Sequence, residues 1–463
     1  MSRYKEYSEY VNSGIDGLGL IPKGWQVMQM KRSVEGCTNG IWGGEPTNDG
    51  SDTIVIRVAD FDRPRLSVNE DGYTYRKIEE KEKTTRRLKR GDLLLEKSGG
   101  GEKTLVGQVV LFDKDFEAVT SNFVAKMTPN IGFDSRYLNY VFSRFYDENI
   151  NYCSIKQNTG IQNLDSASYL SEKFGFPSLQ VQMQIANFLD HETAKIDTLI
   201  EKQQGLIKLL KEKRQAVISH AVTKGLNPNA TMRNSGVEWL GEVPTHWNQI
   251  KMKHILIAII DAEHKTAEYF DDGTYLVCRT TNVRDGILKL DGGKYTNQET
   301  YLEWIKRGVP ESGDILFTRE APAGEACIVP EEPILCLGQR MVLFKLNKSR
   351  MNPQFVLYSI YSGLADDFIK QLSQGSTVSH MNMADIINIP LFETGLDEQD
   401  QIVKHLDRVL ARYDEVQKNA ERTIELIQER RTALISAAVT GKIDVRDWQE
   451  PRQLAPELED AAA

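Results

Sequence analysis

The chain has 463 residues, of which 40% are hydrophobic and 27% charged, so it is long enough for two or three globular domains with sizeable cores. No apolar run approaches the roughly 18 to 20 residues of a membrane span, and the first residues lack the apolar stretch of a secretory signal, which predicts a cytoplasmic protein. The formal net charge of −9 excludes a uniformly basic nucleic-acid binder, although it allows a local basic face.

Two long parts of the sequence resemble each other. Motifs of the first part recur in the same order about 220 residues later. The matching pairs are Ser13–Trp25 with Ser235–Trp247, Gly91–Leu95 with Gly313–Phe317, Gln182–Asp190 with Gln399–Asp407, and Ala216–Thr223 with Ala433–Thr440. The chain is therefore two copies of one unit, each with a mixed globular part followed by a long helical part.

Short runs that are rich in β-branched residues and bounded by turn formers predict strands in both globular parts. The clearest runs are Thr53–Val58, Gly107–Phe112, Tyr275–Arg279 and Met341–Leu346. Helices are fewer, and the better candidates are Tyr137–Phe145 and Phe355–Phe368, which follow the Asx caps Asp134 and Asn352. The globular parts are therefore of mixed α/β type, and the pattern defines no sheet order.

A heptad pattern follows each globular part. Its apolar positions are Ile185, Leu189, Ile196, Leu199, Leu206, Leu210 and Val217 in the first copy, and Ile402, Leu406, Val409, Tyr413, Val416, Ala420, Ile427 and Leu434 in the second. Neither segment contains proline, and Gly225 and Gly441 mark the ends, so each predicts one helix of about 40 residues, or about 60 Å. So long a seam favours a partner helix over two independent amphipathic helices, and the chain path makes the pair antiparallel.

These elements predict an α+β fold of mixed type, with two α/β domains in a pseudo-two-fold repeat separated by a long antiparallel coiled coil of two helices. The expected segments are the first globular domain (1–180), the central coiled-coil helix (181–225), the second globular domain (226–398), the C-terminal coiled-coil helix (399–443) and an acidic, flexible tail (444–463).

No catalytic constellation is present in the sequence. It lacks the glycine-rich phosphate loops, the HExxH zinc motif and the GxSxG nucleophile motif, and neither Asn-Pro pair continues into the Asn-Pro-Pro-aromatic signature of methyltransferases. The five cysteines and seven histidines have no metal-ligand spacing, and the Glu79–Lys83 run is interpreted as a solvated charge run rather than a nuclease fragment. We therefore expect neither a catalytic nor a metal site in this chain.

Three polar regions are candidates for contacts with phosphates or base edges, with ordinary surface hairpins as the alternative. They are the basic run Arg76–Arg90, the loop Lys97–Lys103 with its repeat partner Thr318–Gly324, and the loop Lys156–Asn163 with its counterpart Gln374–Asn382. The candidate DNA-binding residues are Lys97, Ser98, Lys103, Arg86, Arg87, Lys156, Gln157, Asn158, Gln162, Arg279, Arg319, Glu320, Gln374, Ser376, His380 and Asn382.

The sequence resembles the specificity (S) subunit of Type I restriction–modification systems. The resemblance is carried by Ser235–Trp247, Gly313–Leu316, Glu398–Ile402 and Arg430–Lys442, in an order that occurs twice and covers nearly the whole chain. The first copy departs from the pattern at Val181, where glutamate is expected, and at Lys224, which intrudes before the glycine.

The resemblance implies that each globular part is a target recognition domain for one half of an asymmetric, split site in double-stranded DNA, with the helices as a ruler between them. It implies no catalysis by this chain. Two modification subunits would bring S-adenosylmethionine and methylate adenine N6, and two restriction subunits would use ATP and Mg²⁺. Partner docking is expected on helix exteriors beside the seam, namely at Ile200, Ile207, Ile218, Ile424 and Ile435.

Two other classes of function stay open at this point. One is a coiled-coil scaffold that holds two protein-binding domains without touching DNA, which the net acidity favours and the basic run disfavours. The other is a self-sufficient DNA methyltransferase or nuclease. If the resemblance holds, the −9 charge predicts that the isolated chain binds DNA poorly and that the complex with its partners binds it well.

Overall fold

The computed structural model describes residues 4–100, 104–158, 160–236, 240–320, 322–365, 368 and 381–450. The chain forms two compact units: unit 1 comprises Met1–Gln203 and Arg422–Ala463, and unit 2 comprises Gln204–Glu421. Each unit therefore contains one globular part and one portion of each long helix. Within the described ranges, no helix is both long and apolar enough to cross a membrane.

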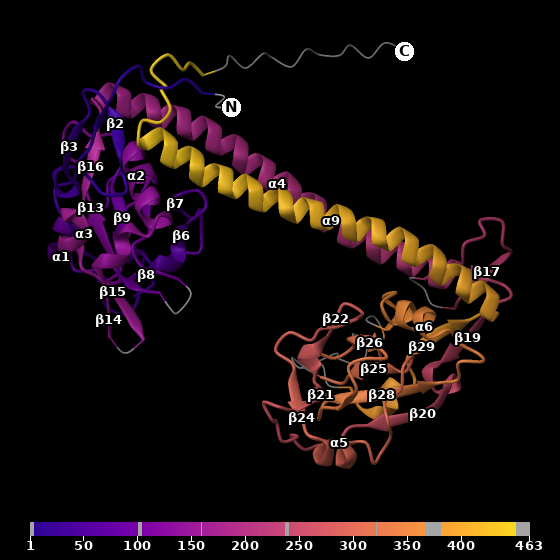
Figure 1. Ribbon diagram of the computed structural model, residues 1–463. Helices are drawn as coiled ribbons and strands as arrows, with labels where there is room; N and C mark the ends of the chain where they lie inside the picture. The colour runs from indigo at the N-terminus through magenta and orange to yellow at the C-terminus, as the bar shows by residue number, and fades with distance from the viewer. Residues whose placement is uncertain are drawn as a thin grey trace, which may run out of the picture. The chain divides into compact units, whose positions relative to one another are not determined.

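Each globular part is built from short strands and a few helices (Figure 1). Unit 1 contains β1 (Tyr10–Asn12), β2 (Leu20–Pro22), β3 (Gln26–Gln29), β4 (Thr38–Asn39), β5 (Thr53–Ile56), β6 (Phe61–Asp62), β7 (Ser67–Val68), β8 (Thr74–Arg76), α1 (Glu80–Arg86), β9 (Leu93–Glu96), β10 (Ser98–Gly99), β11 (Val109–Leu111), β12 (Ala118–Thr120), β13 (Val124–Met127), α2 (Ser135–Asp147), β14 (Ile155–Asn158), β15 (Ile161–Leu164), α3 (Ser166–Ser171) and β16 (Lys173–Phe176). Unit 2 contains β17 (Met232–Asn234), β18 (Glu242–Pro244), β19 (Asn248–Lys251), β20 (Leu256–Asp261), β21 (Tyr275–Cys278), β22 (Val283–Arg284), β23 (Ile287–Leu288), β24 (Lys294–Thr296), α5 (Gln298–Trp304), β25 (Ile315–Thr318), β26 (Ala326–Ile328), β27 (Leu335–Leu337), β28 (Met341–Leu346), α6 (Pro353–Ile360), α8 (Met383–Ile386) and β29 (Pro390–Glu393).

The sequence repeat is also a repeat of sheet topology. Unit 1 has a four-stranded sheet in the order β11-β9-β13-β4, and unit 2 has the same sheet as β26-β25-β28-β20. A second sheet, β12-β5-β8 in unit 1 and β27-β21-β24 in unit 2, joins one parallel and one antiparallel pair in each copy. Equivalent positions in the two units can therefore be assigned from strand register rather than from sequence similarity alone.

The predicted strands are confirmed, with ends that differ by at most two residues. The prediction of a helix at Tyr137–Phe145 is confirmed as α2, and Asp134 caps it by accepting a hydrogen bond from the Tyr137 amide at 3.0 Å. The prediction of one helix over Phe355–Phe368 is too long, because α6 ends at Ile360 and Gly363 follows with φ of +94°. A left-handed residue there stops the helix, and apolar periodicity alone does not report it.

Two long helices carry the repeat, as the heptad pattern predicts. Helix α4 spans Leu179–Lys224 and α9 spans Leu396–Val439, and each is followed by a left-handed glycine, Gly225 or Gly441. Within each unit the α4 and α9 segments lie side by side (Figure 1).

Ion pairs between the helices give their relative direction. In unit 1 Asp197 pairs with Arg431, and in unit 2 Arg214 pairs with Asp414. Asp197 precedes Arg214 on α4, whereas its partner Arg431 follows Asp414 on α9. The two helices are therefore antiparallel. The predicted antiparallel coiled coil is confirmed.

The seam between the helices differs from the predicted one. Leu199, Leu206 and Val416 are 47%, 37% and 42% exposed, so they do not line it. Ile200 and Ile207, which the resemblance placed on the outside, are half-buried, as is Ile424, while Ile218 and Ile435 are buried. After Ile196 an apolar residue follows at both three and four positions, and the structure takes the four-residue step. The sequence pattern fits either step, so it could not define the seam. In this stretch Ile200 and Ile207 face the seam, and Leu199 and Leu206 lie on the outside.

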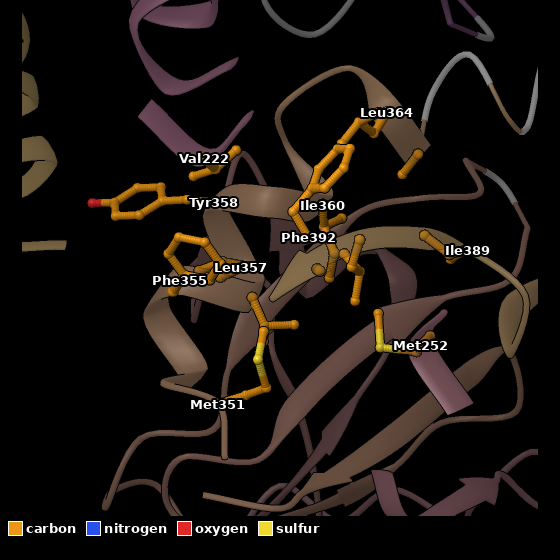
Figure 2. Packing of buried hydrophobic residues seen from close by; sticks show 14 of the residues in the cluster. Val222, Met252, Met351, Phe355, Leu357, Tyr358, Ile360, Leu364, Ile389 and Phe392 are labelled. Atoms are coloured by element: carbon orange, nitrogen blue, oxygen red, sulfur yellow. The ribbon is translucent and has the colours of Figure 1, made fainter. Parts of the chain in front are cut away.

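Each globular core includes the end of the helix that comes from the other sequence copy. In unit 1, Ile185 and Leu189 of α4 join one cluster with Leu434 and Ala438 of α9. In unit 2, Val222 of α4 packs in the cluster shown in Figure 2, with residues of α6 such as Tyr358 and Ile360, and with Phe392 of β29. The matching apolar motifs at the ends of α4 and α9 are thus core residues of the units that they enter.

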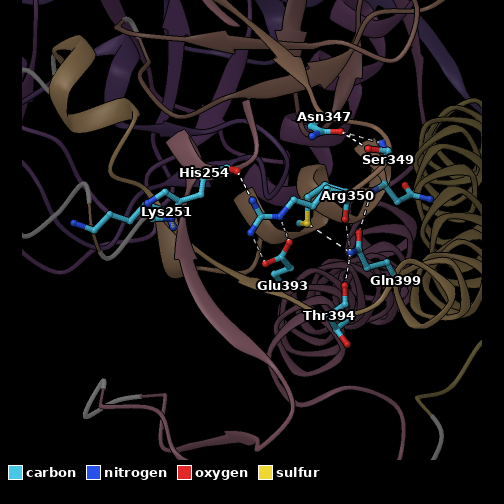
Figure 3. Close-up of polar contacts among 10 residues, drawn as sticks. Lys251, His254, Asn347, Ser349, Arg350, Glu393, Thr394 and Gln399 are labelled. Carbon is cyan, nitrogen blue, oxygen red and sulfur yellow. Dashed lines mark hydrogen bonds and ion pairs between the residues drawn. The ribbon is translucent and has the colours of Figure 1, made fainter. Parts of the chain in front are cut away.

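A buried glutamine ties the start of each long helix to its globular part. In unit 2, Gln399 Oε1 accepts a hydrogen bond from the Asn352 amide at 2.8 Å, and its Nε2 donates to the carbonyl oxygens of Thr394 at 2.7 Å and Arg350 at 3.1 Å (Figure 3). The Arg350 guanidinium in turn binds the Glu393 carboxylate, with Nη2–Oε2 at 2.8 Å. The Gln399 side chain therefore joins the start of α9 to three backbone groups of unit 2 that need hydrogen-bond partners.

Unit 1 repeats this arrangement with different neighbours. Gln182 Oε1 accepts from the Asp134 amide at 3.1 Å, and its Nε2 donates to the carbonyl of Pro177 at 3.0 Å. Eight residues further along each helix, a tyrosine hydroxyl donates to an aspartate of the helix: Tyr140 to Asp190 at 2.9 Å in unit 1, and Tyr358 to Asp407 at 2.5 Å in unit 2. The repeated glutamine and aspartate of the sequence are therefore two fastening points of one helix.

The segment after α9 packs on unit 1. The Asp444 amide donates to the Lys5 carbonyl at 2.8 Å, Val445 is buried, and the Trp448 ring lies 5.6 Å from that of Phe188. The first seven residues of the expected acidic tail are thus packed against the globular part, and residues 451–463 lie outside the described residues.

Replacing the buried glutamine of unit 2 tests its role in stability. We expect Gln399→Ala to lower the free energy of unfolding of the full chain by about 2 kcal/mol, because the buried Thr394 carbonyl and the part-buried Asn352 amide and Arg350 carbonyl lose their partner. Gln401→Ala, at an exposed position two residues further along the same helix, is the matched control and should change it by less than about 0.5 kcal/mol. Equal losses in urea unfolding of the two variants would contradict this role.

Candidate nucleic-acid interface

The predicted basic loops begin where two equivalent strands end. Lys97 follows β9 and Arg319 follows β25, and each side chain reaches the last residue of the sheet's edge strand. Lys97 Nζ donates to Asn39 Oδ1 at 2.7 Å, and Arg319 Nη1 lies 2.9 and 2.7 Å from the two carboxylate oxygens of Asp261. The two copies thus share one geometry with different charges.

Because Asp261 is a carboxylate and Asn39 a neutral amide, Arg319 is neutralised by its partner and Lys97 is not. Arg319 is in an ion pair, its side chain is 12% exposed, and its Nε also donates to the Met381 carbonyl at 3.3 Å. Lys97 binds a neutral amide, and the described part of the chain gives it no ion pair. The neighbouring Glu96 is buried and paired with Arg63 at 2.9 Å, and burial raises the pKa of its carboxyl. Lys97 therefore retains its net positive charge.

A second basic position shows the opposite arrangement. Arg57 follows β5, and its guanidinium makes two hydrogen bonds to the Asp60 carboxylate, at 3.2 and 2.8 Å. Arg279 follows the equivalent strand β21, but Asn282 takes the place of the aspartate and accepts only the Arg279 backbone amide, at 3.0 Å. Arg279 Nη2 donates to the Gly292 carbonyl at 3.0 Å, and its buried Nε has no hydrogen-bond partner among the described residues. Of these four equivalent cations, Lys97 in unit 1 and Arg279 in unit 2 have no carboxylate partner among the described residues.

Arg279 lies at the wall of a cavity of about 190 Å³ in unit 2. Lys265, Thr266, Gln339 and Arg340 also line it. Three cationic side chains thus line a small hollow together with neutral polar ones, Thr280 and Thr281 among them. Such a lining suits a ligand group rich in hydrogen-bond acceptors.

Four of the eight basic residues in the run Arg76–Arg90 form ion pairs within unit 1. Arg87 Nη2 lies 3.2 Å from Glu80 and 3.3 Å from Glu117. Arg86 Nε donates to the carbonyl of Asn39, the residue that also binds Lys97, at 3.1 Å. The structure therefore brings Arg86 and Lys97 together at the end of β4, and it places Arg87 in a local charge network.

The second predicted loop of unit 1 is a β-hairpin formed by β14 and β15. It pairs with β10, so that Ser98 lies opposite Asn163 and its Oγ donates to Asn163 Oδ1 at 2.6 Å. Lys156 Nζ pairs with Asp165 at 2.7 Å, Gln157 is exposed, and Gln162 is buried and accepts a hydrogen bond from the Val106 amide at 3.1 Å. Lys103 and the side chain of Asn158 lie outside the described residues.

Two of the unit 2 candidates, Glu320 and Asn382, lie next to Arg319 or to its partner Met381. The Arg319 backbone carbonyl accepts from the Met381 amide at 3.0 Å, next to Asn382, whose side chain caps α8 by accepting the Asp385 amide at 2.9 Å. Glu320 Oε1 lies 2.9 Å from Arg340 Nε. Gln374, Ser376 and His380 lie outside the described residues.

A turn beside each basic loop was missed by the sequence analysis. It comprises residues 121–124 in unit 1 and 338–341 in unit 2, and we call it the corner turn. Phe123 is 48% exposed, and its carbonyl accepts the amides of Lys97 at 2.8 Å and Ser98 at 3.3 Å. The Arg340 carbonyl likewise accepts the Arg319 amide at 3.1 Å. Strand register makes Phe123 and Arg340 equivalent, whereas the sequences of the two turns share no motif that would have aligned them.

No group of three or more His, Cys, Asp or Glu side chains is arranged to hold a metal ion in the part of the chain that the structure covers. In each unit, polar and basic side chains lie beside the end of the four-stranded sheet. Such a surface can bind acceptor groups of phosphates and bases.

Comparisons with known proteins give the family. Residues 33–209 and 245–426 each match the Type I restriction modification DNA specificity domain. The chain is 23% identical over 434 residues to the putative type I restriction enzyme MjaX specificity subunit of Methanocaldococcus jannaschii, covering 93% of this chain and 96% of that protein. It is 20% identical to the EcoKI specificity subunit of Escherichia coli, covering 79% and 78%.

A solved structure shares the fold. A chain solved in work on complex assembly and conformational transition of the type I R-M system superposes with a TM-score of 0.67 at 14% identity, covering 91% of this chain and 99% of that one. Together with the two domain matches, this confirms the predicted fold class. The chain belongs to the type I restriction–modification DNA specificity family, as a specificity subunit.

The unequal pairing of Lys97 and Arg319 predicts unequal effects on stability. We expect Arg319→Met to lower the unfolding free energy by about 3 kcal/mol, because it leaves the Asp261 carboxylate without its main partner. Lys97→Met, its counterpart in unit 1, should change it by less than about 0.5 kcal/mol. Urea unfolding of the two variants measures both values, and a loss for Lys97→Met as large as that for Arg319→Met would refute the distinction.

Proposed function

We propose that each globular part reads one half of an asymmetric, two-part sequence in double-stranded DNA, and that the coiled coil sets the spacer between the halves. The observation that carries this proposal is the reciprocal placement of charge on one repeated frame. The equivalent pairs are Lys97–Asn39 and Arg319–Asp261, and Arg57–Asp60 and Arg279–Asn282. Two globular parts with the same backbone frame can approach DNA in the same way. Because their side chains differ at equivalent positions, they bind different base sequences.

The chain acts without catalysis of its own and depends on partner subunits. We infer two modification subunits, which hold S-adenosylmethionine and methylate adenine N6, and two restriction subunits, which use ATP and Mg²⁺. Adenine N6 is reached by flipping the base out of the duplex into a pocket of the modification subunit. This chain supplies the position on the DNA, which fits a sequence without methyltransferase, phosphate-loop or nuclease motifs.

The exposed apolar side chains of the two helices are the proposed docking surface for the modification subunits. Leu199, Leu206 and Leu209 of α4, and Val416 and Leu426 of α9, are exposed along the middle of the two helices. Large apolar groups outside the seam gain free energy when a partner covers them. These residues replace the isoleucines that the sequence suggested for this role.

DNA binding by the complex with its modification subunit tests the proposal. We expect the logarithm of the binding constant to fall steeply with the logarithm of salt concentration, since phosphate contacts release counterions. Lys97→Gln should reduce the slope by about 1, because it removes one uncompensated cation. Lys23→Gln, an exposed lysine that pairs with Glu9 in the same unit, is the control and should leave it unchanged.

If the DNA affinity of the complex did not depend on salt concentration, the proposed DNA-reading function would be refuted. A normal slope for Lys97→Gln would refute only this contact.

Lengthening the coiled coil tests its role in the spacer. Seven residues inserted after Gln203 in α4 and seven after Glu421 in α9 keep the heptad register and add about 10 Å. We expect the preferred spacer to grow by about three base pairs while each half-site keeps its sequence. Selection of bound DNA from a library with variable spacers measures both, and an unchanged spacer would contradict the role of the coil.

A further inference from the structure

The corner turn has the same backbone frame in both units. A hydrogen bond from the fourth to the first residue closes it, from Val124 to Ser121 at 3.0 Å in unit 1 and from Met341 to Gly338 at 3.0 Å in unit 2. Its first amide donates to the end of the neighbouring strand, to Ile56 at 2.9 Å and to Cys278 at 2.7 Å. The frame is therefore fixed at both ends, and only its two central side chains extend outward.

Those central side chains are exposed and chemically different in the two copies. They are Asn122 and Phe123 in unit 1, and Gln339 and Arg340 in unit 2, and all four residues are exposed. Each turn lies beside the basic loop of its unit, because its third residue accepts the amide of Lys97 or Arg319. Two rigidly presented, variable side chains beside phosphate-binding groups are well placed to contact base edges.

Neighbouring groups orient the unit 2 side chains so that they offer hydrogen-bond donors. Glu320 Oε1 holds Arg340 Nε at 2.9 Å, which fixes one edge of the guanidinium and leaves its fork directed elsewhere. The Thr266 hydroxyl donates to Gln339 Oε1 at 3.0 Å, which occupies the acceptor of the amide group and leaves its NH₂ as the group that can bind a ligand. Both residues line the cationic cavity beside Arg279. In the major groove, guanine presents two acceptors, O6 and N7, which match a pair of donors.

The unit 1 turn offers a different combination. The Asn122 amide contains both a donor and an acceptor, which match adenine N6 and N7, and the exposed Phe123 ring suits the thymine methyl group. The adjacent Arg57 is paired with Asp60, so the position that corresponds to Arg279 carries no free guanidinium for guanine in unit 1.

We propose that the corner turns are base-reading elements, with Asn122 and Phe123 reading an A·T pair in one half-site and Gln339 and Arg340 reading a G·C pair in the other. This inference rests on the proposed function, and it assigns specificity to four residues outside the loops that the sequence singled out. Glu320 acts through Arg340 as a positioning residue.

Exchange of the turns provides the test, with the chain in complex with its modification subunit and a randomised DNA library. Asn122→Gln with Phe123→Arg should replace an A·T preference at one position of one half-site by a G·C preference, changing the relative affinity about 10- to 100-fold. Gln339→Asn with Arg340→Phe should have the reverse effect at one position of the other half-site. Ile131→Arg, which adds the same charge at an exposed residue of unit 1, is the control and should change no preference.

Single substitutions and modified bases provide a second test that does not depend on the stability of the exchange variants. Arg340→Lys keeps the charge but loses the fork, so it should retain overall affinity and relax the guanine preference. With wild-type protein, uracil in place of thymine at the unit 1 position and 7-deazaguanine in place of guanine at the unit 2 position should each weaken binding. Phe123→Ala and Arg340→Lys should remove the respective effects.

Unchanged base preferences in both exchange variants, with sequence-selective binding intact, would overturn the corner-turn assignment and leave the proposed function standing. A wild-type complex that selects no sequence from the library would overturn both.

Discussion

One buried glutamine at the start of each long helix is the constraint on which the rest of the structure depends. Gln182 and Gln399 satisfy backbone groups of their own globular part, and a tyrosine–aspartate hydrogen bond follows eight residues later on each helix. These contacts fix where each helix leaves its globular part. Because the other end of the same helix supplies core residues to the second unit, each core is completed by the opposite copy. Loss of one fastening point therefore affects the packing of a coil that both copies share.

Most of the fold could be predicted because it rests on local and periodic signals. Repeated motifs indicated the two copies, β-branched runs indicated four of the strands, and Asx caps and terminal glycines indicated where helices begin or end. The seam register could not be predicted, since Leu199 and Ile200 both continue the pattern after Ile196 and only the facing helix distinguishes them. The end of α6 was also missed, because one left-handed glycine stops a run that stays apolar beyond it.

The candidate site was harder to predict for a physical reason. The charge of a basic residue depends on partners far away in sequence, and strand pairing brings Asp261 to Arg319 and Asn39 to Lys97. The sequence marked both cations as equivalent, whereas the structure neutralises only one. Within the basic run, Glu80, Glu117 and Asp115 pair with Arg87 and Arg90, whereas Lys97 at the end of β9 has no ion pair among the described residues. Specificity then follows from different side chains on one repeated frame.

The most direct test of the central claim is a map of N6-methyladenine in a genome exposed to this chain and its modification subunit. The account predicts methylation within a single motif made of two short, different sequences separated by a spacer of fixed length and variable sequence. Exchange of one corner turn should alter one of these sequences alone. A continuous motif, two identical halves, or methylation that is unchanged when this chain is omitted would contradict the account.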